Sequence, residues 1–391
     1  MFTLIKNAEV FSPEALGKKD VLLAFGRIAA IEDQINLQGL PEVKVIEAAG
    51  LKLVPGLIDA HVHIAGAGGE GGPATRTPEL RLSDMISAGV TTVVGCLGTD
   101  GLTRSVESVL MKVKSLRAEG VSAWMYSGAY QVPTPSITGD AARDIALFEE
   151  VIGIGEVAIS DHRSSAPSVA ELTRLAAHAR VAGMISGKAG IVNIHLGDAR
   201  DPFRPLYDVV GSSELTLRQF FPTHINRNEY IFEDAKIYGK EGYVDITTSS
   251  YPYYTDEEIK PSTALRLLLE AGVPIDNITF TSDACGSLPG FDPVTGELVR
   301  LETGLPSANL RELRDAILNE NLPAEIALKV LTSNPAKILK LRRKGKIANG
   351  MDADLILLDS GYNLLSVIAL GEMVMADGKL LKRGAYENSC V

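Results

Sequence analysis

Eight short runs of apolar and β-branched residues recur along this chain of 391 residues, and most are followed by a segment with helical spacing. The runs lie at 56–63, 89–95, 120–130, 156–162, 190–198, 220–227, 243–250 and 278–284. Between them, the segments 75–88, 105–119, 168–183 and 263–272 carry apolar residues at three- and four-residue spacing. Strands that alternate with helices indicate a parallel sheet. Eight such units predict a closed (β/α)8 TIM barrel rather than an open sheet of about six strands.

The two ends of the chain differ from this middle part. Residues 1–53 and 344–391 contain short alternating runs separated by turn residues, and neither end is long enough to form a core alone. The sequence therefore predicts a small β-sandwich domain built from both ends. The barrel, at 54–343, is then inserted between them.

The charge and the cysteine content of the chain exclude several classes of protein. Lys and Arg number 38 against 49 Asp and Glu, which argues against a nucleic-acid partner. Cys96, Cys285 and Cys390 are odd in number and far apart, so the chain has neither a disulfide framework nor a CxxC metal motif. We expect a cytoplasmic protein without a membrane partner, since the sequence shows no signal-peptide pattern and no run of about 18 apolar residues.

Four of the six histidines fall at the ends of predicted strands, where barrels of this kind place their active sites. His61 and His63 end the first strand and point to the same face, because they are two residues apart. His195 and His224 end the fifth and sixth strands, and Asp283 ends the eighth. A lone histidine is often a packing residue, but four on one rim with a carboxylate predict a divalent metal site, with zinc the first choice.

The motifs around these residues, PGLIDAHVH, IHLGD, PTHINR and TSDACGS, resemble the amidohydrolase superfamily. A narrower resemblance to the isoaspartyl (β-aspartyl) dipeptidases lies in GGEGGPATRTPE, GCLGTD, AWMYSGAYQVP and ISDHRSSAP. The resemblance covers nearly the whole chain. It implies a metallo-dipeptidase that cleaves the isopeptide bond of β-aspartyl dipeptides, holds two zinc ions per subunit and forms a homo-oligomer.

The resemblance also implies a set of metal ligands: His61, His63 and Asp283 for the more buried ion, and His195 and His224 for the second. In the family a carbamylated lysine on the fourth strand bridges the two ions. This chain has Glu156 at that position and no lysine in 151–163. Glu156 offers two carboxylate oxygens and resembles the bridging glutamate of other amidohydrolase branches. An alternative stays open, in which Glu156 is a solvated carboxylate on the rim and the site holds one metal.

Hydrolysis of an amide at such a site would use a metal-bound hydroxide, because metal coordination lowers the pKa of water. The resemblance implies that Asp283 acts as general base and then as general acid, and that Tyr130 donates to the developing oxyanion. His162 has no assigned role, although it could orient a ligand or Glu156.

An isoaspartyl dipeptide carries one ammonium group and two carboxylates. Glu70 fits the ammonium, and Arg163 and Arg227 fit the carboxylates because guanidinium groups match them bidentately. Thr99 and Ser287 resemble the family's hydroxyl donors to the same groups, although capping of strand ends explains them almost as well.

Two other functions remain in contention. One is a different amidohydrolase, such as a cyclic amidase or an N-acyl-amino-acid deacylase, and the other is a non-enzymatic barrel kept as an interaction scaffold. A neutral ring needs no pair of arginines, and a scaffold should have lost its metal ligands. The sequence does not predict the metal's identity, the preference for the residue after isoaspartate, or the number of subunits.

Overall fold

The computed structural model describes residues 2–36, 39, 42–292 and 294–387. Eight parallel strands form a barrel in the order in which they occur in the sequence. They are β6 (Leu57–Val62), β7 (Val90–Gly95), β8 (Ser122–Ser127), β9 (Val151–Ile159), β10 (Ile191–Leu196), β11 (Phe220–Thr223), β12 (Val244–Thr247) and β13 (Ile278–Thr281). Strands β6 to β11 form one sheet and β12 pairs with β13. A parallel bridge between Val62 and Ala284 brings the last strand back to the first. The predicted (β/α)8 barrel is confirmed.

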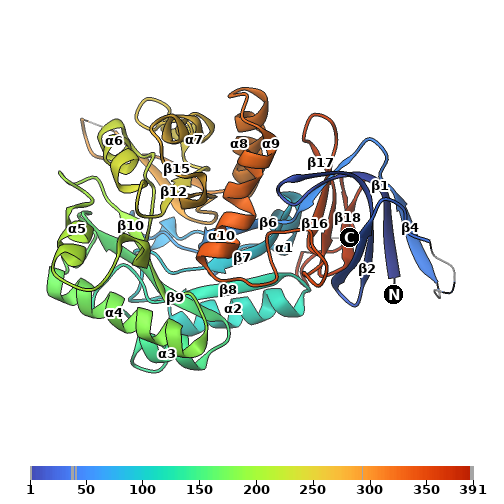
Figure 1. Cartoon of the computed structure of the whole chain (residues 1–391). Coiled ribbons are helices and arrows are strands. Elements are labelled where there is room, and N and C mark those ends of the chain that lie inside the picture. Colours follow the sequence, from blue (N-terminus) through green and yellow to red (C-terminus); the bar gives the residue numbers. More distant parts are fainter. Residues whose placement is uncertain (1, 37–38, 40–41, 293, 388–391) are drawn as a thin grey trace.

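The barrel strands are buried along their length except at the half-buried Trp124 of β8, since each lies between the barrel interior and an outer layer of helices (Figure 1). The α-helices are α1 (Leu82–Ser87), α2 (Val106–Ala118), α3 (Ala141–Leu147), α4 (Val169–Ser186), α5 (Arg204–Gly211), α6 (Glu229–Tyr238), α7 (Pro261–Glu270), α8 (Ser307–Leu318), α9 (Ala324–Ala327) and α10 (Ser333–Ile338). The longest, α4, begins with a reciprocal capping box between Ser168 and Glu171 and ends at Gly187 in the left-handed conformation. Its limits follow from these local signals.

The predicted helix at 75–88 is wrong in its first half, because α1 begins only at Leu82. Pro78 removes a backbone donor there, and the polar groups of this segment are used elsewhere. Thr77 Oγ1 accepts from the backbone N–H of Ala67 at 2.7 Å and donates to the carbonyl of Cys285 at 2.6 Å. The segment is therefore a loop that holds the glycine-rich stretch against the barrel mouth.

Both ends of the chain meet in one nine-stranded sheet beside the barrel (Figure 1, blue and red). Its strands are β1 (Phe2–Phe11), β2 (Ala15–Ala24), β3 (Arg27–Glu32), β4 (Val43–Glu47), β5 (Lys52–Pro55), β16 (Leu355–Leu358), β17 (Leu364–Ala369), β18 (Glu372–Ala376) and β19 (Lys379–Leu380). The two ends join where β5 pairs antiparallel with β16, with Leu53 opposite Leu357. Side chains from both ends, including Ile5, Val10 and Leu355, share a separate core. The division of the chain into domains at 53/54 and 343/344 stays a prediction, and residues 388–391, with Cys390, lie outside the described residues.

After the last barrel strand, β14 (Ser287–Phe291) and β15 (Leu298–Thr303) form an antiparallel hairpin.

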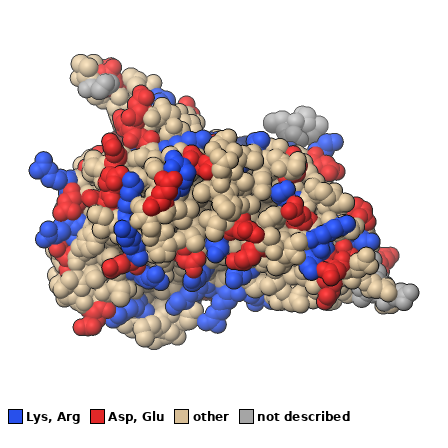
Figure 2. Space-filling model, turned by 45° about the horizontal axis from the view of Figure 1, so that its top comes forward, with Lys and Arg blue, Asp and Glu red and all other residues tan. Residues whose placement is uncertain are grey.

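On the face shown in Figure 2, acidic and basic side chains are interspersed rather than gathered by sign. Within the described ranges, no helix has both the length and the apolar character that a membrane span requires.

Candidate metal centre and substrate pocket

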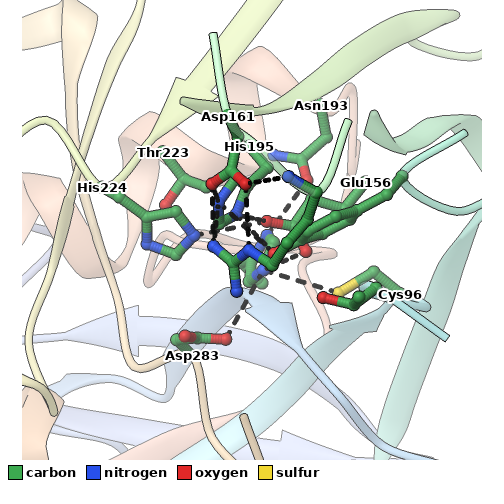
Figure 3. Close-up of polar contacts among 12 residues, drawn as sticks. Cys96, Glu156, Asp161, Asn193, His195, Thr223, His224 and Asp283 are labelled. Carbon is green, nitrogen blue, oxygen red and sulfur yellow. Dashed lines mark hydrogen bonds and ion pairs between the residues drawn. The ribbon is translucent and has the colours of Figure 1, made fainter. Parts of the chain in front are cut away.

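The strand ends surround one pocket, and ten of the twelve predicted site residues line it. They are His63, Glu70, Thr99, Tyr130, Arg163, His195, His224, Arg227, Asp283 and Ser287. The other two, His61 and Glu156, have no exposed surface and contact the lining histidines from within the barrel. The structure therefore brings all twelve residues to one place (Figure 3 shows the polar contacts at its base).

Glu156 lies at the centre of this group, with its two oxygens directed to different histidines. Oε2 is 3.4 Å from His61 Nε2 and 3.8 Å from His63 Nε2. Oε1 is 2.8 Å from His195 Nδ1 and 3.3 Å from His224 Nε2. The idea that Glu156 is a solvated rim carboxylate is wrong, because its side chain is 0 % exposed. Because β9 begins at Val151, Glu156 belongs to the strand itself and faces the barrel interior.

Asp283 supplies the second carboxylate, from the end of the last barrel strand. Its Oδ1 lies 3.0 Å from His63 Nε2 and 3.7 Å from His61 Nε2. Both Asp283, at φ 53°, and His224, at φ 67°, adopt the left-handed backbone conformation. Non-glycine residues adopt it at a cost in free energy, and such residues are concentrated at functional sites.

The residues present fit a divalent metal. Glu156 Oε2 and Asp283 Oδ1 are buried without a hydrogen-bond partner among the described residues, and both face His61 and His63. An unpaired buried carboxylate oxygen is costly, and a bound cation would satisfy it. Burial disfavours the charged form of Glu156, but the neighbouring histidines, His61 first and then His195, hold its pKa well below the usual range. Burial also lowers the pKa of His224 to about 3, which keeps that imidazole neutral and able to donate a lone pair.

Two ring orientations are fixed by residues that the sequence analysis did not identify. Asn193 Oδ1 is 3.0 Å from His61 Nδ1, and Thr247 Oγ1 is 2.7 Å from His224 Nδ1. Such partners leave Nε2 of each ring free toward the carboxylates. Thr247 ends β12, one of the predicted strands, but a threonine there carried no signal of its own.

Asp161 is another residue that the sequence analysis missed, and it organises both arginines. It accepts two hydrogen bonds from Arg163, from Nε at 2.9 Å and from Nη2 at 2.8 Å. Its Oδ2 lies 2.9 Å from His195 Nε2 and 3.8 Å from Arg227 Nη1. The motif ISDHR, in which Asp161 precedes Arg163 by two residues, was the available signal.

Tyr130 reaches the same histidine from the opposite side, with its hydroxyl 2.7 Å from His195 Nδ1. Burial, and then the carboxylate of Glu156, raise the pKa of Tyr130 well above its ordinary value. The phenol therefore keeps its proton and can donate it in a hydrogen bond.

Glu70 and Arg163 are oppositely charged neighbours that both line the pocket. Thr99 Oγ1 donates to Glu70 Oε1 at 2.9 Å, and Arg163 Nη1 lies 3.7 Å from that oxygen. The loop before Glu70 requires glycine at Gly68, where φ is +74° and a Cβ atom would clash with the carbonyl of Thr75. His162 lies at the rim with 84 % of its side chain exposed, and the ion pair described for it is with Asp161 rather than with Glu156.

The ends of the barrel strands bring histidines and carboxylates to one pocket, an arrangement that suits a metal-dependent hydrolase. Residues 247–381 match the sequence model of the amidohydrolase family. The dihydroorotase of Elusimicrobium minutum (strain Pei191) is 26% identical to this chain over 402 residues, which cover 91% of this chain and 88% of that protein.

Two solved structures are more similar. The crystal structure of the beta-aspartyl dipeptidase of Fervidobacterium islandicum AW-1 in complex with beta-Asp-Leu dipeptide is 47% identical, covers 97% of each chain and has a TM-score of 0.91. Another structure of beta-aspartyl dipeptidase from that organism is 44% identical, covers 97% of this chain and 98% of that one, and has a TM-score of 0.88. The chain therefore belongs to the beta-aspartyl dipeptidase family of the amidohydrolase superfamily.

Proposed function

We propose that this protein is a metal-dependent dipeptidase that hydrolyses the isopeptide bond of β-aspartyl dipeptides. One observation supports the proposal: Glu70 lies 3.7 Å from Arg163, Arg227 lies 3.8 Å from Asp161, and Glu70 and both arginines line the same pocket as His63, His195, His224 and Asp283. A zwitterionic substrate with carboxylates at both ends needs such a pairing of one anion with two guanidinium groups.

Two ions, with zinc the first choice, fit the two ligand groups that share Glu156. One group consists of His61, His63 and Glu156 with the neighbouring Asp283, and the other of Glu156, His195 and His224. When bound, such ions lower the pKa of a water molecule and polarise a carbonyl.

The chain's own residues supply the proton transfer. Asp283 lines the pocket, and although burial disfavours its charged form, the neighbouring imidazole of His63 lowers its pKa. It therefore stands ionised, ready to accept a proton from the attacking water and to pass it to the leaving amine. Tyr130 keeps its proton and donates to the oxygen on which negative charge develops.

Substrate recognition is divided between the two sides of the pocket. Glu70, held by the hydroxyl of Thr99, binds the α-ammonium group. Arg163 and Arg227 bind carboxylates, and Ser287 adds a hydroxyl donor at the pocket wall. Leu288 and the ring of Tyr254 also line the pocket and offer apolar surface to the residue after the isoaspartyl unit.

A cyclic amide is the second candidate substrate, because a curated relative is named a dihydroorotase. The decisive experiment compares hydrolysis of β-Asp-Leu, α-Asp-Leu and dihydroorotate by metal-replete protein. We expect cleavage of β-Asp-Leu alone. Cleavage of only the α-peptide or only the cyclic amide, or of none, contradicts the proposal. The homo-oligomer and the cytoplasmic location stay predictions, to be tested by light scattering and by cell fractionation.

A further inference from the structure

Cys96 is a buried thiol that the proposed reaction leaves unused. It directly follows β7, has no exposed surface, and lies on the inner side of the histidine cluster rather than on the pocket wall. Its Sγ is 3.6 Å from His61 Nε2 and 3.7 Å from His63 Nδ1. The sulfur therefore contacts both histidines of the HxH motif.

The distances around His61 match those between ligands of one tetrahedral ion. With bond lengths of about 2.3 Å to sulfur and about 2.1 Å to nitrogen or oxygen, neighbouring ligand atoms lie about 3.4 to 3.6 Å apart. His61 Nε2 is 3.6 Å from the sulfur of Cys96 and 3.4 Å from Glu156 Oε2. His61 Nδ1 is occupied by Asn193, so Nε2 is the nitrogen that faces this space.

A second observation, independent of the thiol, indicates that a ligand belongs there. Glu156 Oε2 is buried without a hydrogen-bond partner among the described residues, on a side chain with no exposed surface, and it faces the same nitrogen of His61. The alternative use of Cys96 is a weak hydrogen bond from its thiol to the carbonyl of Val62 at 3.6 Å, which does nothing for that oxygen.

We propose that Cys96 is a further ligand of the ion held by His61, His63 and Glu156. On binding, the S–H bond breaks, the proton passes to solvent and a sulfur–metal bond forms. The inference rests on the metal dependence in the proposed function, but not on the choice of substrate.

The test is spectroscopic. The protein is stripped of metal and titrated with cobalt(II), and a thiolate ligand gives an intense near-ultraviolet charge-transfer band beside the weaker visible bands. We expect that band in the parent protein and in Cys285→Ser, which removes the other described cysteine, and its loss in Cys96→Ser and Cys96→Ala. X-ray absorption of the zinc-loaded parent should show a sulfur neighbour at about 2.3 Å that is absent from Cys96→Ser.

The outcomes separate the two proposals. Visible cobalt bands without a charge-transfer band, or the same band in the Cys96 variants, overturn the thiolate ligand and leave the metal-dependent function standing. Failure to retain cobalt at all overturns both. If the Cys96 variants do not fold, absence of the sulfur neighbour in the parent's absorption spectrum is enough to reject the thiolate.

Discussion

Nδ1 of His195 lies 2.8 Å from Oε1 of Glu156, two residues on the adjacent strands β10 and β9. The other oxygen of the same carboxylate faces His61 at 3.4 Å. A single glutamate thus stands between the two histidine pairs where related enzymes are expected to have a carbamylated lysine. A glutamate needs no carbon dioxide to become an anionic ligand.

Replacing Glu156 with Gln should remove the charge that both ligand groups share. We expect the affinity of the second ion, at His195 and His224, to fall by more than about 100-fold, since even residues outside the ligand set contribute 10- to 100-fold. Metal content measured after dialysis checks this, and dipeptidase activity should fall with it.

Glu150→Gln is the matched control, because Glu150 is also largely buried but pairs with Lys114 away from the pocket. Unchanged metal content in Glu156→Gln would show that Glu156 is not a ligand. In Glu156→Lys, added bicarbonate should restore metal binding if a carbamate can form at this position.

Asp283→Asn should abolish proton transfer while the fold is retained. Asparagine tolerates the left-handed backbone at this position, where φ is 53°. We expect kcat for β-Asp-Leu to fall by about 10²- to 10⁴-fold, with an unchanged circular dichroism spectrum. Wild-type turnover in the folded variant would exclude Asp283 as the proton carrier.

Arg163→Lys should weaken substrate binding although it keeps the charge. The guanidinium makes two hydrogen bonds to Asp161, a geometry that an ammonium cannot reproduce. Loss of one charged hydrogen bond to substrate, about 1.5–3 kcal/mol, corresponds to a rise in KM of roughly 10- to 100-fold. Arg180→Lys, on the outer helix α4, should leave KM unchanged, and equal effects of the two substitutions would contradict a binding role for Arg163.

Glu258 should make substrate binding sensitive to pH. Burial raises the pKa of this pocket-lining carboxyl to about 7, against the opposing effects of a 2.7 Å hydrogen bond from Ser250 and the charge of Arg227. Below about pH 7 the Glu258 carboxyl is neutral, so the guanidinium of Arg227 is available to bind a carboxylate of the substrate. Above about pH 7 the Glu258 carboxylate competes with the substrate carboxylate for Arg227, so KM for β-Asp-Leu should rise.

Glu258→Gln should remove this rise in KM, whereas Glu257→Gln, a neighbouring residue that also lines the pocket, should keep it. A KM that climbs equally above pH 7 in both variants would assign the titration to another group.

Strong periodic signals made the barrel predictable. Apolar, β-branched runs such as 190–198 were predicted as strands, and because parallel strands end on one rim, the sequence also predicted that His61, His195 and His224 lie on the same rim. The residues that orient the ligands were not predictable in the same way. Asn193 and Thr247 each contact their histidine through one hydrogen bond, and their residue types have no spacing that marks such a role.

Cys96 and Asp161 were missed for a different reason. A cysteine without a second cysteine nearby does not indicate a metal ligand, and its contact with His61 exists only because β6 and β7 are neighbours. Asp161 is one carboxylate among 49 acidic residues, and only the folded loop shows it between two arginines. Tertiary proximity, rather than local pattern, defines both residues.

The pairing of β5 with β16 can form only late in translation, because the whole barrel lies between these two strands in the sequence. Every barrel strand leaves the ribosome before Leu357 can reach Leu53, so a nascent chain carries the unpaired edge of β5 while the rest of the molecule is already able to fold. An exposed edge of this kind can pair with another chain. A chain that stops after the barrel therefore risks aggregation even when its catalytic pocket is complete.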